Sequence, residues 1–352
     1  MKNSKTNVFI DTDMGWDDWC AITLLAQSEY INIVGINVNG VGEAHLTNAK
    51  QNAANIMALN GIYTNEVMLG VGTSVPSSFS NVFPADFRQQ MDNLMGFNDM
   101  PKVDIQGPLM NANESLEKAL NDYEDLTLLA IGGFTNLHNY LTYVEEQKIH
   151  KDIKIPKTVV AMAGVINNDD NKPMGNINSL FPQAYPNNNT AEWNIFIDPK
   201  AAKSVIDKYK SLDSDYSLTL STLNASYQVQ LEQSFIDEIK AGCGTNPSIL
   251  QEFIIHTLQD RLNSAGKGGY NEYFYDPLAA AGITDKEIIN KGSGWGPCKG
   301  DFDVVTELDE GHSTLGKLTY TPNEQSNISY VEYVDDGLFK IIFSKAITNI
   351  TP

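Results

Sequence analysis

The chain has 352 residues, of which 42% are hydrophobic and 19% are charged, a composition typical of a globular protein with a sizeable core. Its 44 acidic and 24 basic side chains give a formal net charge of −20, which repels phosphate backbones and argues against a nucleic-acid partner. We also expect no membrane partner, because the sequence has no run of about 18 apolar residues.

The N-terminal residues and the cysteines bear on the cellular compartment. The N-terminal stretch contains lysines but no apolar segment of about 7 to 15 residues, so we expect no secretory signal. Cys20, Cys243 and Cys298 are widely spaced and form no zinc or redox motif. An odd number of such cysteines is typical of a reducing interior, and we predict a cytoplasmic location.

Strand patterns alternate with helical patterns over the first half of the chain. We expect strands at residues 8–10, 31–38, 67–69, 126–131 and 158–163. Helices are expected at residues 21–28, 44–59, 114–120 and 136–146. This alternation predicts an α/β fold with a mostly parallel, doubly wound sheet flanked by helices. Ligands bind beyond the carboxyl ends of such strands, so the candidate functional loops follow Ile10, Val38, Ile131 and Ala163.

Two long segments, at residues 71–110 and 165–190, interrupt this alternation, and loops of this length usually bind ligands or act as lids. Beyond Asp215 the pattern is mainly helical, most clearly at residues 247–263, followed by a Gly-rich turn at 266–269. Short strands are then expected near Val304, Leu318 and Ile328. With no internal repeat and no linker, one domain over residues 1–352 with a helical C-terminal elaboration is predicted.

The densest acidic pattern, DTDMGWDD, lies between the first strand and the first helix. It places four carboxylates within eight residues, at Asp11, Asp13, Asp17 and Asp18. Carboxylates crowded this closely repel one another unless a cation neutralises them. Oxygen ligands without a Cys or His cluster favour calcium or magnesium over zinc. Helix capping by Asp17 or Asp18 is the alternative, but a cap explains only one or two of the four.

Asp276, in the sequence YDPLAA, is the distant residue best suited to complete a metal site. It precedes a proline at the start of an apolar helix. From spacing alone, an N-cap role explains Asp276 better than a role as a metal ligand.

Four motifs resemble those of the inosine-uridine-preferring nucleoside hydrolase family. The DTDMGWDD loop is similar to the family's DTDxGxDD signature, and AIGGFTNL at 130–137 is similar to its small-Gly-x-x-Thr-Asn turn. AEWN at 191–194, followed by Asp198-Pro199, and DPLA at 276–279 resemble its two later motifs. The matches run in the family's order from residue 8 to about 281, which we take as the core motifs of the domain.

The resemblance implies hydrolysis of the N-glycosidic bond of a ribonucleoside by a calcium-activated water. It implies that calcium is held by the carboxylates of Asp13, Asp18 and Asp276 and by the carbonyl of Ile131. Asp13 is also expected to remove the proton of the attacking water. The residues expected to hold the ribose are Asp17, Asn176, Glu192 and Asn194. An insertion before Glu192 leaves Asn187 and Asn188 as rivals of Asn176, and Asp11 is expected to support the loop.

The sequence departs from the family pattern around the base. Many relatives carry a histidine before the last metal-binding aspartate, as a proton donor to the base, but this chain has Tyr275, which could hydrogen-bond or stack. His256 is the histidine considered as an alternative donor, and Asn39 only approximately replaces a Gly-Asn pair after the second strand. Trp16, Trp193, Tyr273 and Tyr275 could sandwich a flat base, which favours purines slightly, or could instead be core residues.

Two other functions remain alternatives. A magnesium-dependent phosphotransferase of the haloacid dehalogenase type also begins with an apolar strand and an Asp-x-Asp loop, but it leaves AEWN and the Asp17-Asp18 pair unexplained. A non-catalytic calcium-dependent nucleoside or sugar sensor would keep the acidic site without turnover. The family resemblance also implies a homo-oligomer, a dimer or tetramer, although no interface is evident in the sequence.

Overall fold

The computed structural model describes residues 5–78, 81–105, 109–148, 153–167, 172–289, 297–308 and 313–350. The strands are β1 (Thr6–Thr12), β2 (Ile31–Val38), β3 (Met68–Val71), β4 (Met110–Asn111), β5 (Leu126–Ala130), β6 (Thr158–Met162), β7 (Ser217–Ser221), β8 (Cys298–Val304), β9 (Leu318–Pro322) and β10 (Ile328–Val331). The helices are α1 (Trp16–Ala26), α2 (Leu46–Leu59), α3 (Ala85–Asp92), α4 (Ala112–Asp122), α5 (Thr135–Gln147), α6 (Ile177–Leu180), α7 (Trp193–Phe196), α8 (Pro199–Ser211), α9 (Leu223–Ser226), α10 (Gln233–Cys243), α11 (Ile249–Gly268), α12 (Asp276–Thr284) and α13 (Asp336–Thr348). Short 3-10 turns occupy Leu94–Gly96 and Lys286–Ile288.

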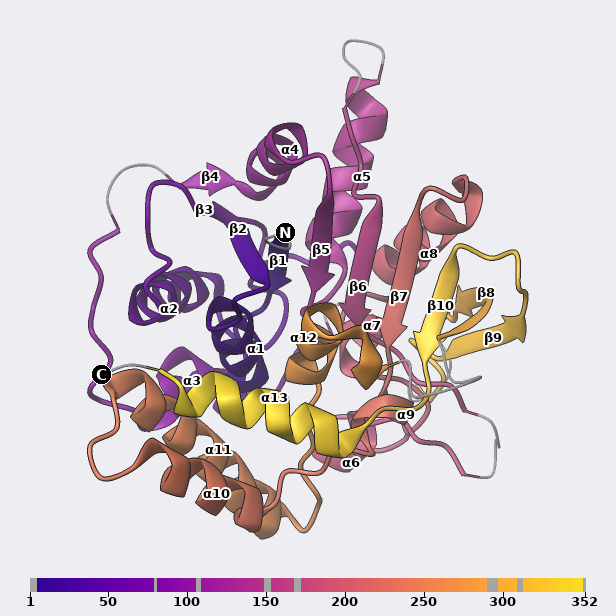
Figure 1. The fold of residues 1–352 in the computed structure, drawn as a ribbon. Coiled ribbons are helices and arrows are strands. Elements are labelled where there is room, and N and C mark those ends of the chain that lie inside the picture. Colours follow the sequence, from indigo (N-terminus) through magenta and orange to yellow (C-terminus); the bar gives the residue numbers. More distant parts are fainter. Residues whose placement is uncertain are drawn as a thin grey trace.

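The strands form one sheet in the order β4-β3-β2-β1-β5-β6-β7-β10-β8-β9, and every pair from β4 to β10 is parallel. Strand β8 is antiparallel to both of its neighbours. The chain builds outward from β1 to β4 and then resumes at β5 on the other side of β1, which creates a topological switch between β1 and β5. In Figure 1 the arrows of β5, β6 and β7 point toward the end of the sheet where α7, α9 and α12 lie. Ligands of such folds bind at this switch point.

Both faces of the sheet are buried, as is usual for parallel strands covered by helices. Ile10 and Leu129 belong to a core shared with α1, α2, α11, α12 and α13. Their sequence neighbours Phe9 and Leu128 face the opposite core, which contains residues of α4, α5 and α8. Helices α1 and α12 also contact each other directly, and this contact brings residue 276 to the acidic loop. The mostly parallel α/β architecture with C-terminal helices is therefore confirmed.

Two local expectations were wrong. Residues 217–221 form β7 where a helical pattern was expected, because Leu218 and Leu220 alternate with polar residues and are fully buried in the sheet. Helix α11 continues through the Gly-rich segment to Gly268, and it ends only at Gly269, whose φ of 74° is left-handed. Within the described ranges, no helix has the length and apolar character needed to cross a membrane.

A close packing contact in the sheet predicts a steric effect on stability. A Cβ added at Gly35 would stand 2.4 Å from the buried ring of Phe9, whereas one added at Gly266 in α11 would meet no atom within 4 Å. We expect Gly35→Ala to lower the free energy of unfolding by about 1–3 kcal/mol through overpacking. Gly266→Ala, the matched control, should raise it by about 0.5–1 kcal/mol by favouring the helix. Urea unfolding midpoints of both variants test this, and an unchanged Gly35→Ala midpoint would contradict it.

Candidate active site

The acidic loop is shaped by hydrogen bonds to its own backbone. The Thr12 hydroxyl donates to the Asp18 carboxylate and accepts from the Met14 N–H at 2.9 Å. The Gly15 N–H donates to the other Asp18 oxygen at 2.8 Å. Met14 has a left-handed φ of 61°, which is uncommon for a residue with a side chain and typical of functional turns. These contacts hold Asp18 at the junction between β1 and α1.

Three carboxylates converge beside this junction. Oxygens of Asp17, Asp18 and Asp276 lie within 4.8 Å of one another, and all three residues are buried. They occupy the first turns of α1 and α12, where the positive ends of two helix dipoles partly offset their repulsion. Burial raises the pKa of Asp17 to about 7 and raises the pKa values of Asp18 and Asp276 well above their usual range. A cation at this position would replace the protons that the cluster otherwise retains.

Asp13 lies in the same cleft but is held from another direction, by the loop after β2. Its Oδ2 accepts from the Glu43 N–H at 3.1 Å, and its carbonyl accepts from the Ala44 N–H at 3.1 Å. A Cβ at Gly42 would stand 1.6 Å from Asp13 Oδ2, so only glycine fits there. Burial raises the pKa of Asp13 to about 6, which suits a group that takes up protons near neutral pH.

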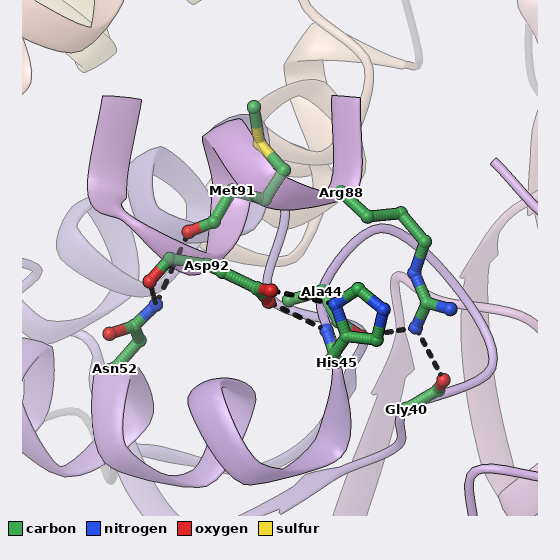
Figure 2. A network of polar contacts seen from close by, with 7 residues as sticks. All are labelled: Gly40, Ala44, His45, Asn52, Arg88, Met91 and Asp92. Atoms are coloured by element: carbon green, nitrogen blue, oxygen red, sulfur yellow. Dashed lines mark hydrogen bonds and ion pairs between the residues drawn. The ribbon is translucent and has the colours of Figure 1, made fainter. Parts of the chain in front are cut away.

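The loop after β2 is anchored to α3, as Figure 2 shows. Arg88 Nη2 donates to the carbonyls of Gly40 and Ala44 at 2.7 and 2.8 Å. The His45 N–H donates to Asp92 at 2.8 Å, and the His45 ring Nδ1 lies 2.6 Å from the other Asp92 oxygen. Helix α3 therefore fixes the loop whose backbone supports Asp13.

Polar side chains after β5 and β6 form a second wall of the cleft. The buried Glu192 carboxylate accepts from the N–H groups of Asn194 at 2.7 Å and Gly164 at 2.8 Å. Asn194 Nδ2 donates to the carbonyls of Met162 at 2.9 Å and Ile131 at 3.3 Å. Burial raises the pKa of Glu192 to about 7. Ile131 therefore lines the cleft beside the Asn194 amide, which contacts its carbonyl, and the Glu192 carboxylate.

Among the three candidate asparagines, only Asn176 lines the cleft. It is buried, and its Oδ1 has no hydrogen-bond partner among the described residues. Asn187 is exposed, and Asn188 is buried in the loop, where its Nδ2 donates to the carbonyl of Leu315 at 2.9 Å. Of the three, only Asn176 is therefore placed to contact a ligand in the cleft.

Nine of the ten predicted site residues line one cleft. They are Asp13, Asp17, Asp18, Ile131, Asn176, Glu192, Asn194, Tyr275 and Asp276. Asn39 does not line it: the side chain is buried behind the acidic loop, where its Oδ1 accepts from the Val41 N–H at 3.2 Å. Asp11 also lies behind the cleft and accepts from Asn136 at 2.8 Å, a position that suits a supporting role.

No histidine among the described residues lines the cleft. His256 borders a separate hollow with Phe97, and its Nε2 lies 3.0 Å from the carbonyl of Met95. His45 contacts Asp92 and His138 lies on α5, while His150 and His312 are outside the described residues. Tyr275 lines the cleft, but burial raises its pKa well above the usual value, so it remains a neutral phenol.

Three charged residues of the cleft were missed by the sequence reasoning: Glu43, Arg261 and Glu272. Glu43 follows the second strand, in a loop that the strand order had already marked as functional. Arg261 shares the buried stripe of α11 with Thr257 and Ala265, at intervals of four residues. A cation on such a stripe was the available signal, because buried arginines are rare unless they are paired.

The two long segments predicted as binding loops meet over the cleft. Phe87 of the first segment meets Phe181 of the second at a centroid distance of 5.2 Å, and Phe83 stacks on Trp193 of α7 at 4.1 Å. The cleft encloses about 50 Å³ of free space, enough for a few water molecules. Parts of both segments, residues 79–80, 106–108 and 168–171, lie outside the described residues.

The donors of the cleft fit a hard divalent cation. Besides Arg261, the polar groups of the described cleft residues are mainly carboxylate, amide, carbonyl and phenol oxygens, and no Cys or His lines the cleft. Calcium takes about six to eight oxygen ligands, and magnesium also prefers oxygen. The raised pKa values of the buried aspartates point the same way, because a cation would stabilise their ionised forms.

The chain is similar to known proteins over most of its length. A family model described as inosine-uridine preferring nucleoside hydrolase matches residues 8–340. Uridine nucleosidase 1 of Arabidopsis thaliana is 24% identical over 288 residues, which cover 82% of this chain and 76% of the relative. A plant nucleoside hydrolase structure has a TM-score of 0.75 at 18% identity, covering 98% and 99% of the two chains. A purine-preferring ribonucleoside hydrolase from Gardnerella vaginalis gives 0.71 at 21% identity, covering 97% and 98%.

The structural likenesses, at these identities, establish the fold. An oxygen-lined cleft at the switch point of this fold, together with the family match, defines the class as an N-glycosyl hydrolase. The chain belongs to the inosine-uridine preferring nucleoside hydrolase family, whose reaction is hydrolysis of the N-glycosidic bond of ribonucleosides. The phosphotransferase alternative is thereby set aside.

The raised pKa values predict how the stability of the metal-free protein depends on pH. Burial raises the pKa values of Asp11, Asp17 and Glu192 to about 7, so the folded chain binds protons that the unfolded chain releases near pH 4. The contribution is fully present below about pH 4 and is lost as the pH rises through 7. We expect the chelated protein to melt several degrees lower at pH 8 than at pH 5, and calcium to reverse this loss. Calorimetry with and without chelator tests it; a melting temperature that rises steadily from pH 5 to 8 in chelator would contradict it.

The contacts of α3 predict the effect of removing Arg88. Arg88→Met leaves the buried carbonyls of Gly40 and Ala44 without these donors. We expect a loss of about 1–3 kcal/mol in the free energy of unfolding. Gln90→Met, at an exposed position of the same helix, is the matched control and should change it little. Thermal unfolding of both variants measures the difference, and equal melting temperatures would show that the anchor is dispensable.

Proposed function

We propose that this protein hydrolyses ribonucleosides to ribose and free base with the help of calcium, held by Asp13, Asp18, Asp276 and the carbonyl of Ile131. The observation that carries the proposal is the convergence of buried carboxylates from α1 and α12 at the switch point of the sheet. Magnesium would fit the same oxygens less well, because it demands a stricter octahedral geometry.

The proposed mechanism assigns the proton transfer to Asp13. When bound, calcium would supply charge neutralisation and lower the pKa of water at the site. The Asp13 carboxylate then removes the proton of the attacking water, and the Glu43 N–H holds that carboxylate in place at 3.1 Å. The surrounding negative charge stabilises the cationic character that the sugar develops as its bond to the base breaks.

The ribose hydroxyls are assigned to Asp17, Asn176, Glu192 and Asn194. The unpartnered Oδ1 of Asn176 is available to accept a hydroxyl proton. Glu192 and Asn194 are fixed by backbone contacts, so they are positioned before the substrate arrives. Such preorganisation allows binding energy from the sugar to lower the barrier.

We propose a slight preference for purine nucleosides. Of the four aromatics considered, Trp16, Trp193 and Tyr275 line the cleft, and Tyr273 packs against Tyr227 instead. Trp193 is already stacked on Phe83, which supports a packing role for it. The Trp16 ring contacts the Arg261 guanidinium at 5.3 Å, which leaves Tyr275 as the aromatic surface proposed for a flat base, and a larger base gains more from stacking.

A homo-oligomer and a cytoplasmic location also remain proposals. The three cysteines are unpaired, which is compatible with a reducing compartment. Sedimentation of the purified protein would test whether a dimer or tetramer forms.

The decisive test is ribose release from inosine, adenosine, guanosine, uridine and cytidine, with calcium and after chelation. We expect Asp13→Asn to lower kcat by about 10³-fold because it removes the base for water. Asp86→Asn makes the same chemical change on the exposed surface of α3 and should leave kcat unchanged. Faster release from purine nucleosides would support the base preference. Binding of nucleosides without release from any of the five would indicate the non-catalytic sensor instead.

A further inference from the structure

A single cation faces a strongly acidic cleft. Seven of the described residues that line it carry carboxyl groups: Asp13, Asp17, Asp18, Glu43, Glu192, Glu272 and Asp276. Among the described residues that line the cleft, Arg261 is the only basic one. It projects from the middle of α11 and is 4% exposed. A charge buried this deeply is costly unless it is paired or hydrogen-bonded.

The guanidinium of Arg261 is held rigidly beside the acidic cluster. Its central carbon lies 5.3 Å from the ring centroid of Trp16 and 5.4 Å from that of Phe87, and Nη2 pairs with Glu272. Trp16 directly precedes Asp17 in α1, so the stacked cation lies next to the carboxylates. Although burial opposes its charge, Glu272 and other carboxylates more than offset this, and the pKa of Arg261 is raised.

This arrangement leaves one donor of Arg261 unused. Nε is buried and has no hydrogen-bond acceptor among the described residues. A guanidinium has five N–H groups in a fixed plane, so the pair with Glu272 can orient the group while Nε contacts a further acceptor. Contacts with the rings of Trp16 and Phe87 also favour this orientation of the guanidinium.

The proposed reaction requires a group that stabilises the departing base. Cleavage moves the electron pair of the C1′–N bond onto the base nitrogen, which makes the base an anion unless it is protonated. The described histidines do not line the cleft, and Tyr275 is a weaker acid than an ordinary phenol. A fixed cation that donates a hydrogen bond to the developing charge meets the same requirement without transferring a proton.

We propose that Arg261 stabilises the departing base by donating a hydrogen bond from Nε as the glycosidic bond breaks. The inference rests on the proposed function. In this step the water oxygen bonds to C1′, Asp13 takes the water's proton and the base leaves with the bonding pair. The base anion takes a proton from solvent after release, Asp13 returns its proton to solvent and Arg261 keeps its own protons.

The test compares two substrates that differ in their need for leaving-group stabilisation. Inosine has a poor leaving group, whereas p-nitrophenyl riboside releases nitrophenolate, which is stable without assistance. The kcat/KM values of both are measured on the full chain with calcium. For Arg261→Met, we expect the kcat/KM for inosine divided by the kcat/KM for nitrophenyl riboside to fall by about 100-fold. This is the usual effect of removing one donor to a developing anion. Arg261→Lys keeps the charge but not the planar guanidinium, so its ratio should lie between those of the unmodified protein and Arg261→Met.

Two controls separate this role from a structural one. Lys267→Met removes a cation from an exposed position of the same helix and should leave the ratio unchanged. Arg261→Met leaves Glu272 buried without its partner and could prevent folding. The double variant Arg261→Met/Glu272→Gln avoids this, and its ratio should fall by the same factor when compared with Glu272→Gln alone.

Equal losses for both substrates would overturn the inference and leave the proposed function standing, because they indicate a general structural effect. An unchanged ratio in the folded double variant would also overturn it. An unmodified protein that cleaves neither substrate would instead refute the proposed function, and the inference with it.

Discussion

Electrostatic repulsion among buried carboxylates is the constraint on which the rest of this site depends. Asp17, Asp18 and Asp276 bring their oxygens within 4.8 Å of one another in a cleft with room for a few water molecules. Ionised together, such groups are strongly unfavourable without compensation. The fold supplies part of it through the N-termini of α1 and α12 and through backbone donors such as Gly15. A bound cation would supply the remainder, and its binding would then be coupled to local folding.

The surrounding structure keeps these groups from relaxing apart. Arg88 fixes the loop that holds Asp13, and the close approach of Gly42 prevents that carboxylate from swinging away. On the opposite wall, Glu192 and Asn194 are bound to the backbone at the ends of β5 and β6. The residues proposed to bind the sugar are therefore held at the ends of the strands, whereas Phe83, Phe87 and Phe181 of the cleft wall come from the two long segments. Preorganised polar groups of this kind need little rearrangement when a substrate binds.

The sequence predicted those parts of the molecule whose signal is local. The alternation of strands and helices identified the parallel sheet, and four aspartates in eight residues identified the acidic loop. Strand β7 was missed because three of its five residues are Ser or Thr and it lies among helices. Arg261 was missed because its role depends on Trp16, Phe87 and Glu272, which are distant in sequence and meet only in the folded chain. Asn39 failed to line the cleft because the loop after β2 turns it behind Asp13, a path that spacing could not reveal.

The place of β10 in the sheet has a consequence for how the chain acquires its structure. It pairs in parallel with β7 although more than 100 residues separate the two strands, from Ser221 to Ile328. During synthesis the edge of β7 therefore stays open while α10, α11 and α12 are made. Pairings of such high contact order form slowly, and an unpaired strand edge invites association with other chains. The yield of native protein should thus depend on chaperones and on the speed of translation, even where the finished enzyme is stable.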